Sequence, residues 1–270
     1  MRRCIICDVN CRLPLHREAM IDTYAAGLRH TWHRHEQAVV TLLLQGHVRE
    51  NVGSNDVIVG PLAVGVKPIG IRHADHFGTE GVRALRLEFL PDELSELGRY
   101  AAALETWRWL ADTASIRAIL AAFLFEHDAD AKYQALATLD VDRHRRAGCP
   151  PRWLATVRES VADCYRQRIS LGSLATLHDV HPVYLAREFR RHYGESVGQC
   201  IRRLRLHDAV SRLLHHDSSL AAIALRCGFS DQAHMTRLMQ FELGTTPGML
   251  RRRFRDMPVR VVQDSRDSAV

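Results

Sequence analysis

The chain has 270 residues, of which 46% are hydrophobic and 25% charged, a composition typical of a soluble protein with two domains. No stretch approaches the roughly 18 to 20 uncharged apolar residues that a membrane span needs, so we expect no membrane partner. The start, Met1-Arg-Arg-Cys-Ile-Ile-Cys-Asp8, lacks the longer apolar core of a secretory signal, and the cysteine count of seven is odd. We therefore expect reduced thiols and a cytoplasmic protein.

The net charge of +6 is unevenly distributed. Residues 150–270 hold 19 Arg and no Lys against 12 Asp plus Glu, a balance of +7. The remaining 149 residues hold 18 basic and 19 acidic groups, a balance of −1. Because the whole positive excess lies in the C-terminal part, we expect that part alone to have a polyanionic partner.

Residues 31 to 89 have the pattern of short strands. Runs rich in β-formers lie at 39–44, 56–59 and 82–89, and glycines separate them at intervals suited to turns. Many short strands with regular turns predict a small antiparallel barrel or jelly roll.

Two histidine motifs lie in the same region. His33-Arg-His35 precedes one strand run, and Pro68-Ile-Gly-Ile-Arg-His73 follows about one hairpin later. The pair resembles the two motifs of the cupin superfamily, whose histidines converge inside a β-barrel. Alternation along a strand puts His33 and His35 on one face, as a shared metal requires. Glu36 would point to the opposite face, so the glutamate ligand of metal-binding cupins is missing.

Two interpretations of these histidines remain open. His33, His35 and His73, with His76 as a further candidate, could hold a divalent metal. Alternatively, they line a small-molecule pocket or satisfy hydrogen bonds at the mouth of the barrel. The alternative function is a metal-dependent cupin enzyme or a metal sensor. Because an enzyme of this kind requires the full ligand set, and the glutamate is missing, we predict that the chain is not an enzyme.

The remaining N-terminal segments carry weaker signals. Cys4–Cys11 holds a CxxC pair without a nearby fourth ligand for zinc, so we expect apolar packing there. A helix should begin at Pro91 and continue with apolar residues at helical spacing, and a second should span 115–126 with an apolar stripe. That stripe would cover the barrel or form a dimer seam. The basic segment Arg143–Pro151, which ends in Pro-Pro, predicts the linker between the domains.

From Pro151 onward the pattern is helical and repeats itself. A shift of about fifty residues aligns Leu174-Ala175 with Ile223-Ala224, and Gly194–Ser196 with Gly244–Thr246. A long helix from 196 to 215 would join the two copies.

The second copy has the clearer local signature. After a short helix, Gly228 supplies a residue that can adopt positive φ, and Ser230 or Asp231 can cap the next helix. This arrangement is a helix-turn-helix, whose second helix fits the DNA major groove. In the first copy Asp179 replaces the turn glycine, and aspartate tolerates the left-handed conformation.

The pattern of residues 170–254 resembles the AraC/XylS family of transcription regulators. The family signature covers the second copy, in these residues: Ile223-Ala, Gly228-Phe-Ser, Arg237, Gly244-Thr-Thr-Pro247 and Leu250-Arg251. Met235, Met239 and Leu250 stand where the family has aromatic residues, and these apolar replacements should keep the core.

The resemblance implies an α+β fold in three parts. Residues 1–148 would form a cupin-like antiparallel β-barrel with flanking helices, a domain that senses an effector and often dimerises. Residues 149–258 would form the double helix-turn-helix DNA-binding domain, and 259–270 a disordered tail.

The resemblance also implies how DNA is bound. The connecting helix would set the two reading helices about one turn of DNA, roughly 34 Å, apart, so that they enter successive major grooves. The candidate DNA contacts lie near the start of each reading helix: His181, Val183 and Arg187 in the first, and Gln232, Ala233, His234 and Arg237 in the second. Glutamine suits adenine, whereas each arginine could contact guanine or a phosphate.

We therefore predict a transcription regulator in the bacterial cytoplasm, associated with the nucleoid when bound to DNA. Its expected partners are double-stranded promoter DNA, RNA polymerase if it activates, a small-molecule or metal effector, and a second copy of the chain in a homodimer.

Overall fold

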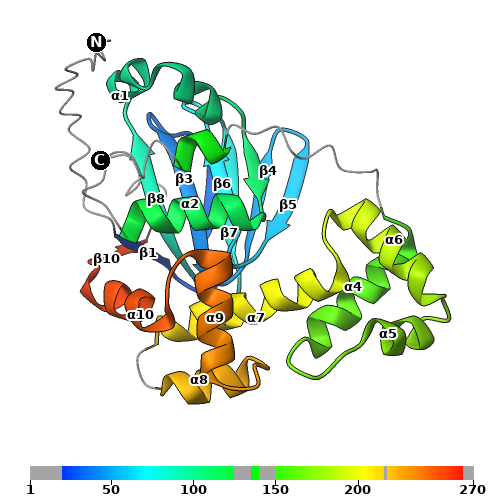
Figure 1. Ribbon diagram of the computed structural model, residues 1–270. Helices are drawn as coiled ribbons and strands as arrows, with labels where there is room; N and C mark the ends of the chain where they lie inside the picture. Colours follow the sequence, from blue (N-terminus) through cyan, green and yellow to red (C-terminus); the bar gives the residue numbers. More distant parts are fainter. Residues whose placement is uncertain (1–19, 125–134, 140–149, 216–217, 264–270) are drawn as a thin grey trace, which may run out of the picture.

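The computed structural model describes residues 20–124, 135–139, 150–215 and 218–263. Cys4–Cys11 and most of the predicted linker, residues 143–149, lie outside the described residues. A half built mainly of strands lies beside a helical half (Figure 1), which confirms the predicted α+β class. None of the described helices has both the length and the apolar character needed to cross a bilayer.

Two sheets form the N-terminal half. The strands are β1 Ile21–Tyr24, β2 Arg29–His33, β3 Ala38–Gln45, β4 Val48–Val52, β5 Asn55–Val59, β6 Val64–Lys67, β7 His73–Phe77, β8 Val82–Phe89, β9 Arg108–Leu110 and β10 Val259–Val262. The six-stranded sheet has the order β10-β1-β8-β3-β6-β9, and the four-stranded sheet the order β2-β7-β4-β5. The three predicted runs fall in β3, β5 and β8, and the pairings are antiparallel except that of β10 with β1.

The six-stranded sheet is buried on both faces. Along β3, Leu42 and Leu44 belong to a large core shared with the helices, which we call the shared core. The alternate residue Leu43 belongs to a smaller cluster between the two sheets, the inter-sheet cluster. Burial on both faces explains why β3 is an almost uninterrupted apolar run instead of an alternating one.

The helical segment after the strands is divided. Helix α1 spans Pro91–Glu96, and a 3-10 helix follows over Gly98–Leu104 instead of one continuous helix. Gly98 has a φ of +53°, a conformation that interrupts the α-helix. Helix α2, Thr113–Leu124, buries Ile119 and Phe123 in the shared core, so its apolar stripe covers the sheet and is not a dimer seam.

The C-terminal half consists of seven helices within its described residues. They are α4 Arg152–Cys164, α5 Leu171–Leu177, α6 Pro182–Tyr193, α7 Val197–Leu213, α8 Leu220–Arg226, α9 Gln232–Leu243 and α10 Pro247–Asp256. The internal repeat is visible in matched lengths, since α5 and α8 have 7 residues each and α6 and α9 have 12 each.

The two helix-turn-helix units are held differently. The first unit, α4 to α6 with the start of α7, has a core of its own that includes Leu185 and Phe189. The second unit, α8 to α10, contributes Met235 and Met239 to the shared core. In Figure 1, α9 stands below α2 against the sheet half, whereas the α4–α6 lobe lies at the far end of α7. The second unit is therefore packed against the six-stranded sheet, and the first is connected to it through α7.

The predicted disorder of residues 259–270 is wrong for Val259–Val262, which form β10. β10 pairs in parallel with the edge of β1, whose backbone groups would otherwise be unpaired on that side. Val262 is buried and Arg260 pairs with the buried Asp22, so alternate side chains of β10 anchor it. Residues 264–270 lie outside the described residues.

Candidate functional site

The first reading helix begins with the predicted residues. His181 is the N-cap of α6, and its side chain accepts a hydrogen bond from the backbone N–H of Val183 at 3.3 Å. Pro182 occupies the first turn, where its missing N–H is tolerated. Val183 is 69% exposed, and Arg187 is exposed one turn later. The three candidate contacts therefore lie on the open surface at the start of α6.

The second reading helix has a similar start. Asp231 caps α9 by accepting the His234 backbone N–H at 2.7 Å. Gln232, Ala233 and Arg237 are exposed, while the core positions of the same helix are buried as predicted. Exposed side chains thus lie at the N-terminus of the second helix in both units, the position from which such a helix contacts base edges in the major groove.

Neighbouring groups restrain two of the seven candidates. The His234 ring lies against Ser230, with 3.1 Å between Nδ1 and Oγ, and edge-on to Phe229, so it is held in the turn. Arg187 donates from Nε to the carboxylate of Glu188 at 3.1 Å. Part of the Arg187 charge is therefore balanced by Glu188.

The turn of each helix-turn-helix unit contains a residue with positive φ, and a different residue type supplies it in each unit. Asp179 adopts a φ of +51°, so the left-handed conformation expected of it is present. Gly228 has a φ of +86°, and a Cβ there would lie 2.5 Å from the carbonyl oxygen of Arg166. The end of α4 therefore packs against the turn of the second unit, where only glycine fits.

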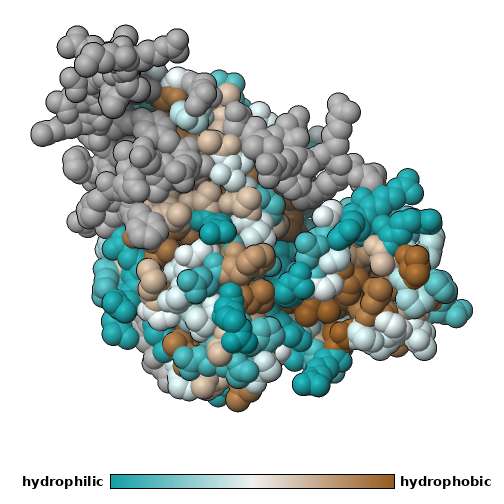
Figure 2. Space-filling model, viewed as in Figure 1, coloured by the Kyte–Doolittle hydropathy of each residue, from teal (hydrophilic) through white to brown (hydrophobic). Residues whose placement is uncertain are grey.

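In the view of Figure 2, the surface of the helical half is largely hydrophilic, and hydrophobic residues, coloured brown, gather on the α4–α6 lobe. Leu177 and Val183 are exposed apolar side chains of that lobe. An exposed apolar group at the start of a reading helix suits contact with a thymine methyl.

A second site lies between the two sheets, where three of the predicted histidines converge. Their ring centroids are 4.2 Å apart for His33 and His73, 5.0 Å for His33 and His35, and 5.0 Å for His35 and His73. One ring nitrogen from each lies within 4.8 Å of the others. His76 is on the opposite face of β7 from His73 and does not join them.

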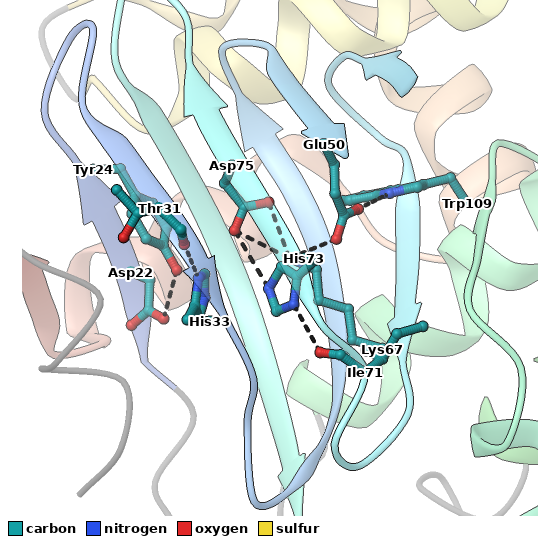
Figure 3. Close-up of polar contacts among 10 residues, drawn as sticks. All are labelled: Asp22, Tyr24, Thr31, His33, Glu50, Lys67, Ile71, His73, Asp75 and Trp109. Atoms are coloured by element: carbon teal, nitrogen blue, oxygen red, sulfur yellow. Dashed lines mark hydrogen bonds and ion pairs between the residues drawn. The ribbon is translucent and has the colours of Figure 1, made fainter. Parts of the chain in front are cut away.

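The hydrogen bonds of two histidines fix their protonation. Nδ1 of His33 is 2.7 Å from the carbonyl oxygen of Thr31, and Nδ1 of His73 is 3.2 Å from that of Ile71 (Figure 3). A carbonyl oxygen only accepts, so Nδ1 of each of these two rings carries a proton. Burial, together with nearby cationic side chains, lowers the pKa of His35 and of His73 to about 2. Both imidazoles are therefore neutral at neutral pH.

Buried charges next to the histidines were not found from the sequence. Lys67 lies 2.9 Å from Glu50 and 3.3 Å from Asp75, and the Trp109 indole donates to Glu50 (Figure 3). Burial favours the neutral amine of Lys67, but Asp75 and Glu50 overcome it and raise the pKa, so Lys67 stays charged. Asp75 could have been anticipated, because it lies two residues after His73 on the same strand face. Lysine and glutamate are rarely buried, so nothing in the sequence indicated that Lys67 and Glu50 lie inside the protein.

Arg86 is a second buried cation beside the cavity. Its guanidinium lines the same cavity, 3.6 Å from Asp22 and 3.3 Å from Glu88. In these ion pairs Nε of Arg86 faces Asp22 and Nη2 faces Glu88. Apolar side chains such as Leu43 and Phe77 complete the lining. The cavity is thus lined by both apolar and charged side chains.

The same residues also fit a divalent metal. Three imidazoles with Asp75 close to His73 are a set of nitrogen and oxygen donors that transition metals accept, and the proton on Nδ1 of the neutral His73 leaves its Nε2 as the coordinating nitrogen. Lys67 and Arg86 oppose a cation at this position, and Glu50 and Asp22 offset them.

A family model described as a helix-turn-helix domain matches residues 174–253. The probable transcription factor PqrA of Proteus vulgaris is 31% identical over 100 residues, which are 37% of this chain and 78% of that protein. The transcriptional activator RhaS of Pectobacterium carotovorum subsp. carotovorum (strain PC1) is 33% identical over 87 residues, or 32% of this chain. The matched residues span only 31% of the length of that RhaS protein.

Solved structures were also similar in part. The DNA-binding domain of the global transcriptional factor AdpA, in complex with a target DNA, is 26% identical over 40% of this chain and 95% of that chain, with a TM-score of 0.36. ToxT from Vibrio cholerae O395 is 8% identical over 89% of this chain and 98% of that chain, with a TM-score of 0.38.

Proposed function

Because the chain belongs to the AraC/XylS family of DNA-binding transcription regulators, we propose that it is a one-component regulator whose barrel binds a small-molecule effector. The observation that carries the proposal is a polar cavity in the barrel together with two reading helices in one chain. Such a regulator would act in the bacterial cytoplasm as a homodimer on promoter DNA, and as an activator it would contact RNA polymerase.

The DNA-binding role of α6 and α9 is tested by titrating the full chain against genomic DNA fragments at several salt concentrations. We expect a sequence preference whose affinity falls steeply with salt, because the C-terminal part carries the positive excess. Binding without sequence preference or salt dependence would contradict the proposal.

Within that experiment, Gln232→Ala should lose about 1–3 kcal/mol of discrimination at one base pair, because an exposed glutamine at the start of a reading helix can pair with adenine. The matched control is Gln240→Ala, an exposed glutamine two turns further along α9, which should leave the preference unchanged. A loss that is equal across all sequences would assign Gln232 to the DNA backbone instead.

A second candidate is that the effector is a metal ion, which the histidine geometry favours. His33, His35 and His73 would hold the ion, and the metal would supply a charged centre that ties β2 and the residues after it to β7 within the four-stranded sheet. Bound metal should raise the unfolding free energy, by about 2.7 kcal/mol at a hundredfold excess over Kd.

Metal analysis of the untagged protein, followed by thermal unfolding with added Zn²⁺, Mn²⁺ or Fe²⁺, tests this candidate. His35→Ala should abolish the stabilisation, and His76→Ala, on the other face of β7, should not. Equal responses in the two variants would assign metal binding to another place, and no response in the unsubstituted protein would leave the cavity to organic ligands.

A further inference from the structure

The first reading helix carries a set of planar side chains in contact near its start. The Tyr184 ring is stacked against the Trp153 indole, with 5.5 Å between the ring centroids and 23° between the planes. The guanidinium carbon of Arg187 lies over the same Tyr184 ring, 5.3 Å from its centroid. These distances are within the range of aromatic stacking and of cation–π attraction. Tyr184 therefore connects Arg187, a candidate DNA contact, to an aromatic residue of another helix.

The stack runs from the core of the first unit to its surface. Tyr184 and Arg187 are three residues apart in α6, so they lie on the same face of the helix. Trp153 is the second residue of α4 and packs against the separate core of the first unit. Trp153 is half-buried, whereas Tyr184 is 42% exposed. The position of the Tyr184 ring is thus set by a residue that is itself anchored in the core.

Glu188 is a second restraint on the same guanidinium. It accepts the hydrogen bond from Nε of Arg187, and its side chain is only 8% exposed, so the carboxylate has little freedom to move. The Arg187 side chain nevertheless remains 70% exposed. Because the hydrogen bond uses Nε, the donors on Nη1 and Nη2 are those that can meet an acceptor on DNA. Arg187 is therefore held in place without being covered.

The second unit does not repeat this arrangement. At the positions fifty residues further on, Arg237 matches Arg187, but His234 replaces Tyr184 and Leu238 replaces Glu188. The His234 ring is held in its own turn, and a leucine offers no charge to an arginine. The restraint is therefore a property of the first reading helix and is not required by the repeated fold.

We propose that Tyr184 and Trp153 are positioning residues that hold Arg187 in the orientation from which it contacts DNA. The proposal rests on the DNA-binding role of α6 proposed above and adds the residues that orient one of its contacts. An arginine side chain loses rotamer freedom when it binds, and a restrained arginine has lost part of that freedom before DNA arrives. Removal of the Tyr184 ring should therefore weaken DNA binding only through Arg187.

A double-mutant cycle in the full chain tests this dependence on the preferred genomic fragment. Tyr184→Ala should raise the Kd for that fragment about two- to fivefold, the size of one cation–π contact at an exposed site. In the Arg187→Ala background the same change should have no further effect, because the side chain that Tyr184 positions is absent. Tyr184→Phe, which keeps the ring, should restore the Kd of the unsubstituted protein.

A second readout needs no DNA. The side-chain Nε–H signal of Arg187 in the nuclear magnetic resonance spectrum can be assigned by its absence in Arg187→Lys. Tyr184→Ala should shift this signal, because the aromatic ring beside the guanidinium is lost. Trp153→Leu should shift it less in the same direction, because Tyr184 loses the surface against which it stacks. The matched control is Trp32→Leu, an exposed tryptophan of the barrel, which should leave the signal unchanged.

Several results would overturn the proposal. An equal rise in Kd on Tyr184→Ala with and without Arg187 would make Tyr184 a direct DNA contact. An unchanged Kd in Tyr184→Ala or in Arg187→Ala, or an unmoved Arg187 signal in Tyr184→Ala or Trp153→Leu, would also contradict it. In each of these cases the unsubstituted protein still binds its preferred fragment. Absence of sequence-specific binding by the unsubstituted protein would instead refute the proposed function.

Discussion

The cavity is assembled from residues that strands rarely bury. His35 and His73 are kept neutral by burial and by nearby cations, whereas Lys67 is kept charged by Asp75 and Glu50. Burying such groups costs free energy unless each is paired, and Glu50 and Asp75 supply that pairing for Lys67.

In the helical half, the packing at the turn of the second unit depends on one residue, Gly228. Gly228→Ala should destabilise the protein by more than the roughly 1–2 kcal/mol that a left-handed conformation costs an L-residue. The additional loss arises because the new Cβ would lie 2.5 Å from the carbonyl oxygen of Arg166. Chemical denaturation followed by circular dichroism measures the difference.

Gly194→Ala is the control for that prediction. Gly194 has a φ of +72°, but nothing lies within 4 Å of a Cβ built there. Its substitution should show the conformational cost alone. Equal losses at Gly194 and Gly228 would mean that the end of α4 moves away at little cost.

At the scale of helices and strands, much of the fold follows from sequence periodicity. The runs that became β3 and β8 and the repeat that became α5–α6 and α8–α9 are long or duplicated, so the pattern predicts them well. Convergence of His33, His35 and His73 was foreseeable from the two histidine motifs, but not from strand alternation, because β2 ends at His33 and His35 lies beyond it.

The features that could not be predicted depend on tertiary contacts. β10 has only four residues and is stabilised by the edge of β1 and by Asp22, which are distant in sequence. Arg86 lies in a strand whose two faces are both buried, so alternation does not identify its inward position. Long-range pairing of this kind leaves no local signal in the sequence.

A set of hydrogen bonds to Asp208 holds the two helix-turn-helix units in position relative to each other. Asp208, in the middle of α7, accepts hydrogen bonds from the Tyr165 hydroxyl at 3.1 Å, Arg166 Nε at 2.9 Å and Arg212 Nε at 2.7 Å. The end of α4 is thereby attached to α7 next to the turn at Gly228. This attachment holds the first unit at a set position relative to the second, as binding to two successive grooves requires.

At the scale of the molecule, the six-stranded sheet separates the cavity from the second helix-turn-helix unit. One face of β3 lines the cavity, and the other packs against the shared core to which α7 and α9 contribute. A change in the cavity is therefore one sheet away from the second reading helix, whereas the first unit has its own core at the far end of α7.

This arrangement predicts unequal coupling of the two units to the barrel. Leu42→Ala removes a fully buried side chain of the shared core and should cost about 2–5 kcal/mol. Native-state hydrogen exchange should then accelerate in α8–α10 together with the strands, and α5 and α6 should change little. Leu185→Ala, in the separate core of the first unit, should accelerate exchange in α5 and α6 alone. If Leu42→Ala accelerated exchange equally in both units, the helical half would unfold as one body, and the barrel would act on both reading helices alike.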